Sequence, residues 1–288
     1  MKSFVGKVIA ITGAGSGLGR AMAMQLAEQG AQLSLSDLNA QGLEETKALC
    51  NMAAGARISA TTIDVRDESQ LALWAEQTQA EFGVIDALIN NAGVSLNACV
   101  DDTSIDNYRW VMDINFWGML IGTKIFLPFI RQSNHGHIVF ISSVYGMMGG
   151  VDQSAYASSK FAIRGFAESL RQELQLTDPN ITITCAHPAG LKTNFMENAR
   201  FGQRVGYTKS DEQLKKDFSE SLAVTSPEQA AKAILAGMLK EKSRLLVGRD
   251  AKFFFDPLIR LFPTRYGSIV SWVVHRLTRS NAKMSVSN

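Results

Sequence analysis

The sequence predicts an α/β protein in which a doubly wound parallel sheet forms a single domain, followed by a helical extension at the C-terminus. Short apolar runs alternate with longer stretches at helical spacing through most of the 288 residues. The short runs are apolar at successive positions, which is typical of parallel strands covered on both faces. Right-handed crossovers then give a doubly wound sheet. We assign residues 1–248 to the domain and residues 249–288 to the extension.

The elements follow from the same pattern, in order along the chain. Strands are expected at residues 7–12, 31–37, 57–64, 84–90, 137–142, 181–187 and 244–248. Helices are expected at residues 17–30, 40–53, 67–82, 104–131, 153–176 and 227–240. Gly30 ends the first helix, and Ser226 before Pro227 begins the last. The polar stretch 192–225 is expected to be a substrate loop with short helices.

The composition excludes several classes of protein. A net charge of +2 gives no general reason to expect nucleic acid as a partner. Cys50, Cys99 and Cys185 form no CxxC pair, which favours a reducing compartment and a cytoplasmic location. The four histidines show no metal-ligand spacing, so no metal is expected. The first residues run directly into a strand pattern without room for a signal peptide, and no apolar run is long enough to span a bilayer.

Two short stretches carry chemistry. TGAGSGLG, residues 12–19, lies between the first strand and the first helix, where glycines let the backbone approach a pyrophosphate at the helix N-terminus. SAYASSK, residues 154–160, places Tyr156 and Lys160 on one helix face. A nearby ammonium lowers the pKa of a phenol toward neutrality and makes it an effective acid and base. The alternative is a pair of side chains on an exposed helix surface.

Together with NNAG at residues 90–93 and Ser143, thirteen residues before Tyr156, these motifs resemble the short-chain dehydrogenase/reductase family. The resemblance covers about residues 5 to 248. It implies a Rossmann-type domain that transfers a hydride between a nicotinamide cofactor and an alcohol or ketone. A catalytically silent NAD-binding sensor or scaffold is the alternative, which the intact set of motif residues argues against.

The resemblance also implies the catalytic residues. Tyr156 is the acid and base, Lys160 also bonds the nicotinamide ribose, and Ser143 positions the substrate oxygen. Asn115 matches an asparagine that holds a water linking Lys160 to solvent. For Ser143 the alternative is a turn serine, and Ser142 beside it is easily confused with it. For Asn115 the alternative is a buried amide with satisfied hydrogen bonds.

Cofactor selectivity is expected from Asp37 at the end of the second strand. Its carboxylate can accept hydrogen bonds from the adenosine ribose and would repel a 2′-phosphate, and Leu38 supplies no positive charge. We therefore expect NAD(H) rather than NADP(H), unless Asp37 is merely a helix N-cap. The residues expected to bind the cofactor are Gly13, Ser16, Gly17, Leu18, Gly19, Asp37, Asp64, Val65, Asn91, Ala92, Gly93, Tyr156, Lys160, Pro188, Leu191 and Thr193. Ala189 replaces a family glycine and would be strained if that position required a positive φ, unless the neighbouring Gly190 absorbs the turn.

The candidate substrate pocket is largely apolar. Its expected residues are Val94, Ser95, Tyr145, Met147, Met148, Val151, Phe195 and Met196. None of them supplies a charge for an anionic group, which favours a lipophilic alcohol or ketone. The protein is expected to be a homodimer or homotetramer.

The C-terminal extension has a charge of its own. From Lys242 to the end, the sequence contains nine Lys and Arg residues and two Asp residues, which give this segment a net charge of +7. Residues 1–241 therefore carry a net charge of −5. Residues 251–279 predict two short helices, one of them amphipathic and basic with Trp272 at its apolar face. Such a helix suits the surface of an anionic membrane. The corresponding hypothesis for the whole protein is a lipid or steroid dehydrogenase that is recruited to a membrane. The alternative is that its apolar face packs on the domain or on a second subunit.

Overall fold

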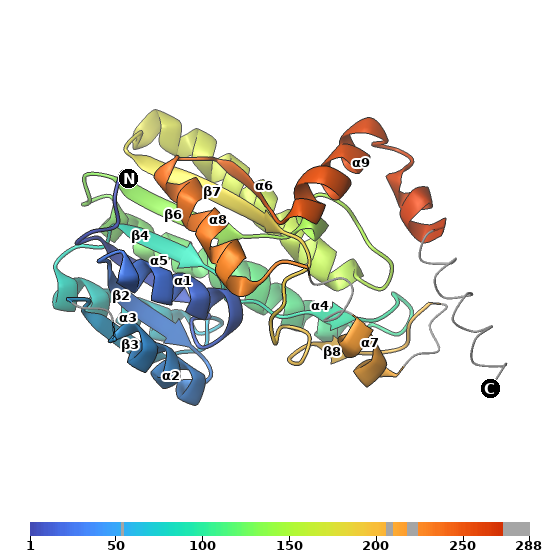
Figure 1. The fold of residues 1–288 in the computed structure, drawn as a ribbon, viewed down its shortest axis with the longest axis horizontal. Coiled ribbons are helices and arrows are strands. Elements are labelled where there is room, and N and C mark those ends of the chain that lie inside the picture. The colour runs from blue at the N-terminus through green and yellow to red at the C-terminus, as the bar shows by residue number, and fades with distance from the viewer. Residues whose placement is uncertain (53–54, 206–209, 218–223, 273–288) are drawn as a thin grey trace.

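The computed structural model of the chain describes residues 1–52, 55–205, 210–217 and 224–272. Its centre is a seven-stranded parallel sheet with the strand order β3-β2-β1-β4-β6-β7-β9 (Figure 1). The strands are β1 (Val8–Thr12), β2 (Gln32–Asp37), β3 (Ile58–Thr62), β4 (Ala87–Asn90), β6 (Gly136–Ile141), β7 (Ile181–Pro188) and β9 (Arg244–Val247). The predicted doubly wound, Rossmann-type fold is confirmed, with all seven predicted strands in a single domain.

Helices cover both faces of this sheet (Figure 1). One layer holds α1 (Gly17–Glu28), α2 (Ala40–Cys50) and α8 (Pro227–Leu239), whose apolar side chains share one buried cluster. The other layer holds α3 (Glu68–Phe82), α5 (Gly118–Ile130) and α6 (Ser154–Thr177), which share a second cluster. The strands contribute to both clusters by alternation: Ile9 and Ile11 of β1 belong to the first, and Ala10 to the second. This double burial explains why the strands are apolar at successive positions.

The helix expected at residues 104–131 is divided in the structure. It consists of α4 (Ile105–Met112), a π-helical turn (Asp113–Trp117) and α5. A π turn contains one more residue than an α turn, and such turns are frequent at functional sites. The turn contains Asn115, whose buried side chain bonds the backbone of Val94 and the hydroxyl of Ser159.

Residues 192–225 are tied to the domain by a small second sheet. In it β5 (Leu96–Asn97) pairs in parallel with β8 (Arg200–Phe201). A short helix, α7 (Asp211–Asp217), follows. The two ends of the segment meet in a bridge between Leu191 and Thr225, so the segment leaves and rejoins the domain at one point.

The extension begins with a π-helical turn (Ala251–Phe255) that continues into α9 (Asp256–Leu261), and residues 266–272 form a further helical segment. The two predicted helices are therefore present as far as the structure describes the chain. Of the predicted apolar face, Ile269 and Val270 are half-buried and Trp272 is exposed. Val273, Val274 and Leu277 lie outside the described residues. In the described part of the chain, no helix is long and apolar enough to cross a membrane.

Candidate active site

The glycine-rich turn between β1 and α1 is tightly packed against the loop that follows β4. Gly13 has φ = +66°, and a Cβ there would lie 2.8 Å from Cα of Ala92. A Cβ on Gly19 would overlap the carbonyl oxygen of Gly13. Only glycine fits both positions, and their backbone is thereby free to approach a ligand closely.

Hydrogen bonds fix this turn to the loop after β4. Thr12 Oγ1 accepts from the backbone N–H groups of Asn91 (3.0 Å) and Ala92 (3.1 Å). Asn91 Nδ2 in turn donates to the carbonyl oxygens of Thr12 and Gly13. The structure thus brings together two motifs that are nearly eighty residues apart in the sequence.

The N-terminus of α1 is suited to an anion. Its N-cap residue, Ser16, makes no side-chain capping hydrogen bond, and its first turn holds no acidic residue. Other helices are capped by side chains, namely those of Asn39, Asp67, Ser104 and Ser226. Free first-turn amides beside a close-packed glycine turn fit the pyrophosphate of a dinucleotide.

Asp37 is anchored beside the glycine turn. Its Oδ2 accepts from Gly15 N and its Oδ1 from Asn39 N, each at 2.8 Å. Each carboxylate oxygen has a second lone pair, so both can still accept from a ribose hydroxyl. Asn39, and not Asp37, is the N-cap of α2, which removes the alternative reading of Asp37. Leu38 is 67% exposed.

Asp64 and Val65 lie in the loop between β3 and α3, and Val65 lies against Gly118 at the start of α5. Asp64 accepts hydrogen bonds from Arg66, and these lower the pKa of its carboxyl group. A Cβ on Gly118 would lie 2.8 Å from the carbonyl oxygen of Val65. The glycine at the start of α5 therefore lets this loop lie close to the helix.

Tyr156 and Lys160 are both buried on α6, and neither belongs to a surface pair. Lys160 Nζ donates to the carbonyl oxygen of Ile141 (2.9 Å) and lies 5.4 Å from the centroid of the Tyr156 ring. Burial lowers the pKa of Lys160 to about 8, since a low-dielectric site disfavours the ammonium. Burial also raises the pKa of the Tyr156 phenol, against the effect of a hydrogen bond with Ser143. The predicted lowering of the phenol pKa is therefore not found in this structure, because desolvation by burial is the largest effect on the phenol.

The two neighbouring serines have different partners. Ser143 Oγ accepts from Tyr145 N (3.2 Å), lies 3.4 Å from the carbonyl oxygen of Pro188, and is the hydroxyl beside Tyr156. Ser142 Oγ donates to the carbonyl oxygen of Lys160 (2.9 Å) and so fixes α6 against β6. Ser143 is therefore the serine that contacts the Tyr156 hydroxyl, and Ser142 supports the helix.

Asn115 occupies the space between α6 and the loop after β4. Its Oδ1 accepts from Val94 N (2.8 Å), and its Nδ2 donates to Val94 O (3.0 Å) and Ser159 Oγ (2.9 Å). A Cβ on Gly93 would lie 3.2 Å from Asn115 Oδ1 and 3.6 Å from Lys160 Nζ. The side chain of Asn115 is thus a satisfied buried amide that holds Gly93 next to Lys160.

The segment after β7 lies over the glycine turn. A Cβ on Gly17 would lie 3.3 Å from Cβ of Thr193, so the predicted contact residue Thr193 is adjacent to the start of α1. Among the described residues other than glycine, only Asp152 and Glu241 have positive φ. Ala189 is not among them, so the condition under which strain was expected there is not met and its backbone is unstrained.

The predicted pocket residues do not all surround Tyr156. The rings of Tyr145 and Phe195 lie on it, with centroids 6.1 and 5.9 Å away. Ser95 is buried and its carbonyl oxygen accepts from Arg200 N, while Met196 is half-buried in the turn after Phe195. Met147 packs instead with Val144 and Ala251, where the extension meets the domain.

Two supporting residues were not predicted. Arg20 donates to the carbonyl oxygens of Gly15 (2.6 Å) and Gly42 (3.0 Å), and so holds the glycine turn to α2. Asp250 Oδ2 accepts from Gly190 N (3.3 Å) and fixes the segment after β7. Arg20 directly follows the glycine motif, which was a usable signal. Asp250 lies sixty residues from its partner, and no sequence pattern indicates it.

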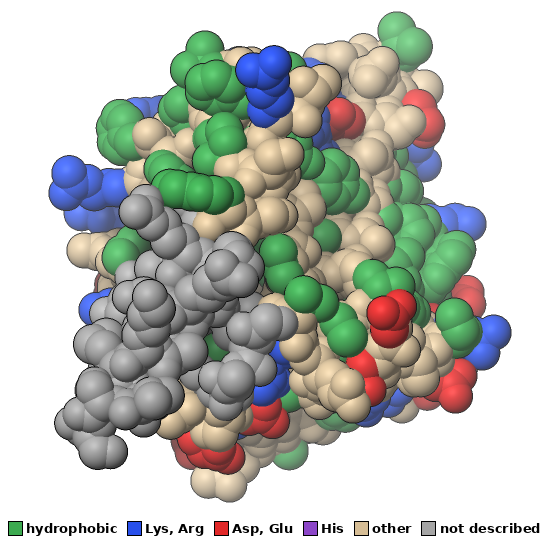
Figure 2. Space-filling model, turned by 90° about the vertical axis from the view of Figure 1, so that its right-hand side faces the viewer, with side chains coloured by type: hydrophobic (Ala, Val, Ile, Leu, Met, Phe, Trp, Pro, Cys, Tyr) green, Lys and Arg blue, Asp and Glu red, His purple; other side chains and the backbone are tan. Residues whose placement is uncertain are grey.

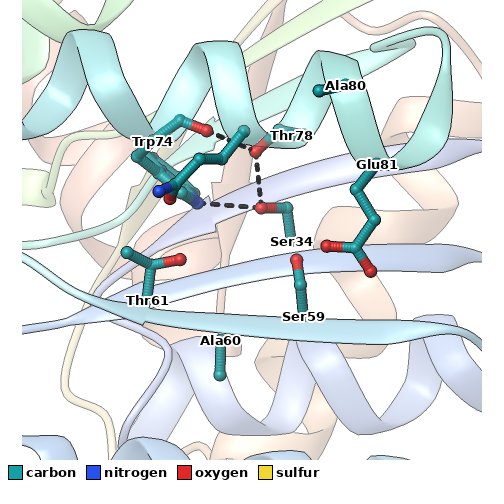
Figure 3. Close-up of a pocket in the computed structure, with 9 residues that line it drawn as sticks. Ser34, Ser59, Ala60, Thr61, Trp74, Thr78, Ala80 and Glu81 are labelled. Carbon is teal, nitrogen blue, oxygen red and sulfur yellow. Dashed lines mark hydrogen bonds between the residues drawn. The ribbon is translucent and has the colours of Figure 1, made fainter.

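A hollow of about 470 Å³ lies elsewhere, between β2, β3 and α3 (Figure 3). Its polar groups bond one another: Trp74 Nε1 donates to Ser34 Oγ (2.8 Å), which also pairs with Thr78 Oγ1 (2.7 Å). None of the predicted site residues lines it. This hollow therefore lies apart from the cluster around Tyr156. In the described part of the chain, no group of His, Cys, Asp and Glu side chains could hold a metal ion.

Comparison with known proteins agrees with this geometry. A sequence profile described as short chain dehydrogenase matches residues 7–204. The chain belongs to the short-chain dehydrogenase family. The putative oxidoreductase SadH of Mycobacterium tuberculosis is 41% identical over 271 residues, which cover 94% of this chain and 96% of that protein. This coverage exceeds what residues 1–248 alone supply, so the similarity reaches into the extension.

Other family members are similar over most of their length. Epidermal retinol dehydrogenase 2 of Mus musculus is 35% identical, covering 94% of this chain and 82% of that protein. Human estradiol 17-beta-dehydrogenase 11 is 31% identical, with 93% and 83% covered. A short chain dehydrogenase/reductase from Burkholderia phymatum in complex with NAD superposes with a TM-score of 0.82 at 27% identity, with 93% and 97% covered. The chain is therefore a short-chain dehydrogenase of the oxidoreductase class.

Proposed function

We propose that the protein transfers a hydride between NAD(H) and a lipophilic alcohol or ketone, with Tyr156 as the acid and base. The observation that carries the proposal is the buried cluster in which the Tyr156 phenol meets the Ser143 hydroxyl, with Lys160 one helical turn away. A silent sensor or scaffold would have no need of this complete set.

Each residue has a distinct role in the proposed reaction. When bound, the nicotinamide accepts or supplies the hydride. The Tyr156 phenol is protonated at neutral pH even at its ordinary pKa of about 10. This is the form that donates a proton to a carbonyl oxygen during reduction. Ser143 orients the substrate oxygen, and Lys160 binds the nicotinamide ribose. Tyr145 and Phe195 cover the phenol and exclude water.

We assign the cofactor as NAD(H) because of the residues around Asp37. A 2′-phosphate at this position would meet a carboxylate that is fixed by two backbone N–H groups. Leu38 offers it no positive charge. Arg20, the nearby cation, already donates to the carbonyl oxygens of Gly15 and Gly42 and pairs with Glu45.

The substrate is proposed to be lipophilic. The rings at Tyr156 are apolar on their faces, and two relatives are named for acting on retinol and estradiol. Contact with a membrane through residues 251–279 would bring the enzyme to such compounds. We also propose a homodimer or homotetramer, because Trp117 and Phe161, on the π turn and on α6, are exposed apolar side chains at 48% and 41%.

Replacement of Tyr156 by Phe tests the proposal. It removes the transferable proton and leaves the glycine turn intact, so turnover should fall by about a hundredfold or more. The measurement is NADH absorbance with a panel of secondary alcohols and ketones of graded size. NADH binding, followed by fluorescence, should be retained.

Tyr108→Phe is the matched control. It removes the phenol of Tyr108 on α4, which bonds Ser154 on α6, the helix that also carries Tyr156. It should keep near-normal turnover. Residual activity above a tenth of wild type in folded Tyr156→Phe would contradict the assignment.

A further inference from the structure

The extension has an inner face that packs on the domain. Ala251, Phe255 and Ile259, four residues apart, belong to one apolar cluster with domain residues. The domain residues of this cluster are Val144, Met147, Ala189 and Leu246. An ion pair between Arg244 and Asp256 (3.3 Å) adds a second attachment. The first helix of the extension is thus attached to the domain by this inner face.

The outer face of the same helix is apolar and exposed. Phe253 and Phe254 are 76% and 55% exposed, and Leu261 and Phe262 are 72% and 45% exposed. The two pairs are eight residues apart, which is also the separation of buried Ala251 from half-buried Ile259. The π turn inserts one extra residue, so residues eight apart return to nearly the same side of the helix. We call Lys252, Phe253, Phe254, Leu261, Phe262 and Arg265 the outer face.

The charges on this face have one sign. Lys252 directly precedes Phe253 and Arg265 follows Phe262 by three residues, in the turn after α9, and both basic residues are exposed. The acidic residues of the extension are held inward: Asp250 bonds Gly190 and Ala251, and Asp256 pairs with Arg244 and Arg260. Figure 2 views this side of the molecule and shows hydrophobic side chains mixed with Lys and Arg side chains over its upper part.

We propose that the outer face docks on the surface of an anionic lipid bilayer, with the four apolar side chains in the interface and the basic side chains at the headgroups. Aromatic and aliphatic side chains interspersed with basic ones are the composition that binds such surfaces. A symmetric contact between two copies would instead bring like charges together. The helix also stands away from the sheet at one edge of the molecule, where a flat surface can reach it (Figure 1).

Docking places the catalytic cluster beside the lipid. Val144 and Ala189, which the extension contacts, directly follow Ser143 and Pro188 of the site. A lipophilic substrate dissolved in the bilayer would then reach Tyr156 from the membrane side. This consequence rests on the proposed function, whereas lipid binding itself does not.

Sedimentation with vesicles tests the docking. The full chain should bind vesicles of phosphatidylcholine and phosphatidylglycerol, bind pure phosphatidylcholine far less, and release at high salt. Phe253→Ser with Leu261→Ser should lower binding about tenfold or more, because it removes two exposed apolar side chains from the interface. Lys252→Gln with Arg265→Gln should lower it about fivefold for each charge removed.

Matched controls alter similar residues away from the outer face. Leu73→Ser with Leu176→Ser changes two exposed leucines, at 54% and 87% exposure, and Lys232→Gln with Lys240→Gln removes two exposed charges. Both controls should bind like the wild type. Equal losses in the controls, or no vesicle binding by the wild type, would overturn the proposal. A fall in molecular mass of the Phe253/Leu261 variant without vesicle binding would assign the face to a second copy instead.

Turnover separates this proposal from the proposed function. The outer-face variants should turn over a water-soluble alcohol as the wild type does and lose activity only toward a vesicle-borne substrate. If vesicles bind the wild type but no alcohol or ketone is turned over, the docking survives and the dehydrogenase assignment fails.

Discussion

The carboxylate of Asp37 anchors the glycine turn and, in the proposed complex with NAD, would also accept hydrogen bonds from the adenosine ribose. Because it accepts from Gly15 N, its removal should loosen the turn as well as relax selectivity. The exposed side chain of Leu38 leaves room for a longer one. A change of cofactor preference therefore has to be measured as a ratio of affinities rather than as one affinity.

Asp37→Ala with Leu38→Arg should shift the preference from NAD toward NADP, since it removes a repelling charge and adds an attracting one. Leu38→Arg alone is the control and should keep the NAD preference, because the carboxylate remains. Dissociation constants for both cofactors give the answer. A wild-type protein that binds NADP more tightly would show that Asp37 does not select.

Among individual residues, the members of the sequence motifs could be predicted, because each motif is recognised from the types and spacing of residues close together in the chain. The pKa values of Tyr156 and Lys160 could not, since they depend on burial by segments far apart in the sequence. The lack of strain at Ala189 is a property of backbone angles that no residue identity reveals.

Helices and strands could be predicted wherever apolar residues recur at a regular helical or strand spacing without interruption. The π turn at residues 113–117 was not, because it preserves a helical pattern while adding one residue. The small sheet of β5 and β8 was missed, since two-residue strands leave no periodicity. The outer face of the extension could not be predicted, because it is defined by which side of the helix packs on the domain.

Two glycines on neighbouring helices should respond oppositely to alanine. Gly118→Ala at the start of α5 would place a Cβ 2.8 Å from Val65 O, and should lower the unfolding free energy by about 1–3 kcal/mol. The same change should weaken NAD binding if Val65 lines the adenine.

Gly165→Ala in α6 is the control, because its Cβ would meet nothing within 4 Å. It should raise the unfolding free energy by about 0.5–1 kcal/mol. Urea denaturation measures both variants. If both variants changed the unfolding free energy by the same amount, the contact between a Cβ at position 118 and Val65 O would be relaxed by small shifts of the backbone without loss of stability.

The whole molecule should be sensitive to acid through buried histidine. His137 in β6 is fully buried, with Nε2 bonded to Thr184, and burial lowers its pKa to about 3. The unfolded chain takes up this proton near pH 6.5, so stability is lost as the pH falls from there toward 3. His187 has a pKa lowered to about 4 by burial and acts in the same direction.

His137→Asn should therefore flatten the pH dependence, removing about 2 kcal/mol of the loss between pH 7 and pH 5. His135→Asn, an exposed histidine two residues earlier, should leave the dependence unchanged. Urea titrations at the two pH values are the measurement. An unchanged slope in His137→Asn would show that this imidazole is not the titrating group.

The bridge between Leu191 and Thr225 has a consequence for how the family can diversify. Lys192 N donates to Thr225 O and Thr225 N to Gly190 O, so the excursion between them begins and ends at adjacent backbone positions. A segment whose ends already meet can be lengthened at small entropic cost. Residues 193–224 are in this sense a replaceable cassette. If they form the proposed substrate loop, grafting the corresponding stretch of another dehydrogenase here should change which substrates are accepted while the sheet beneath stays in register.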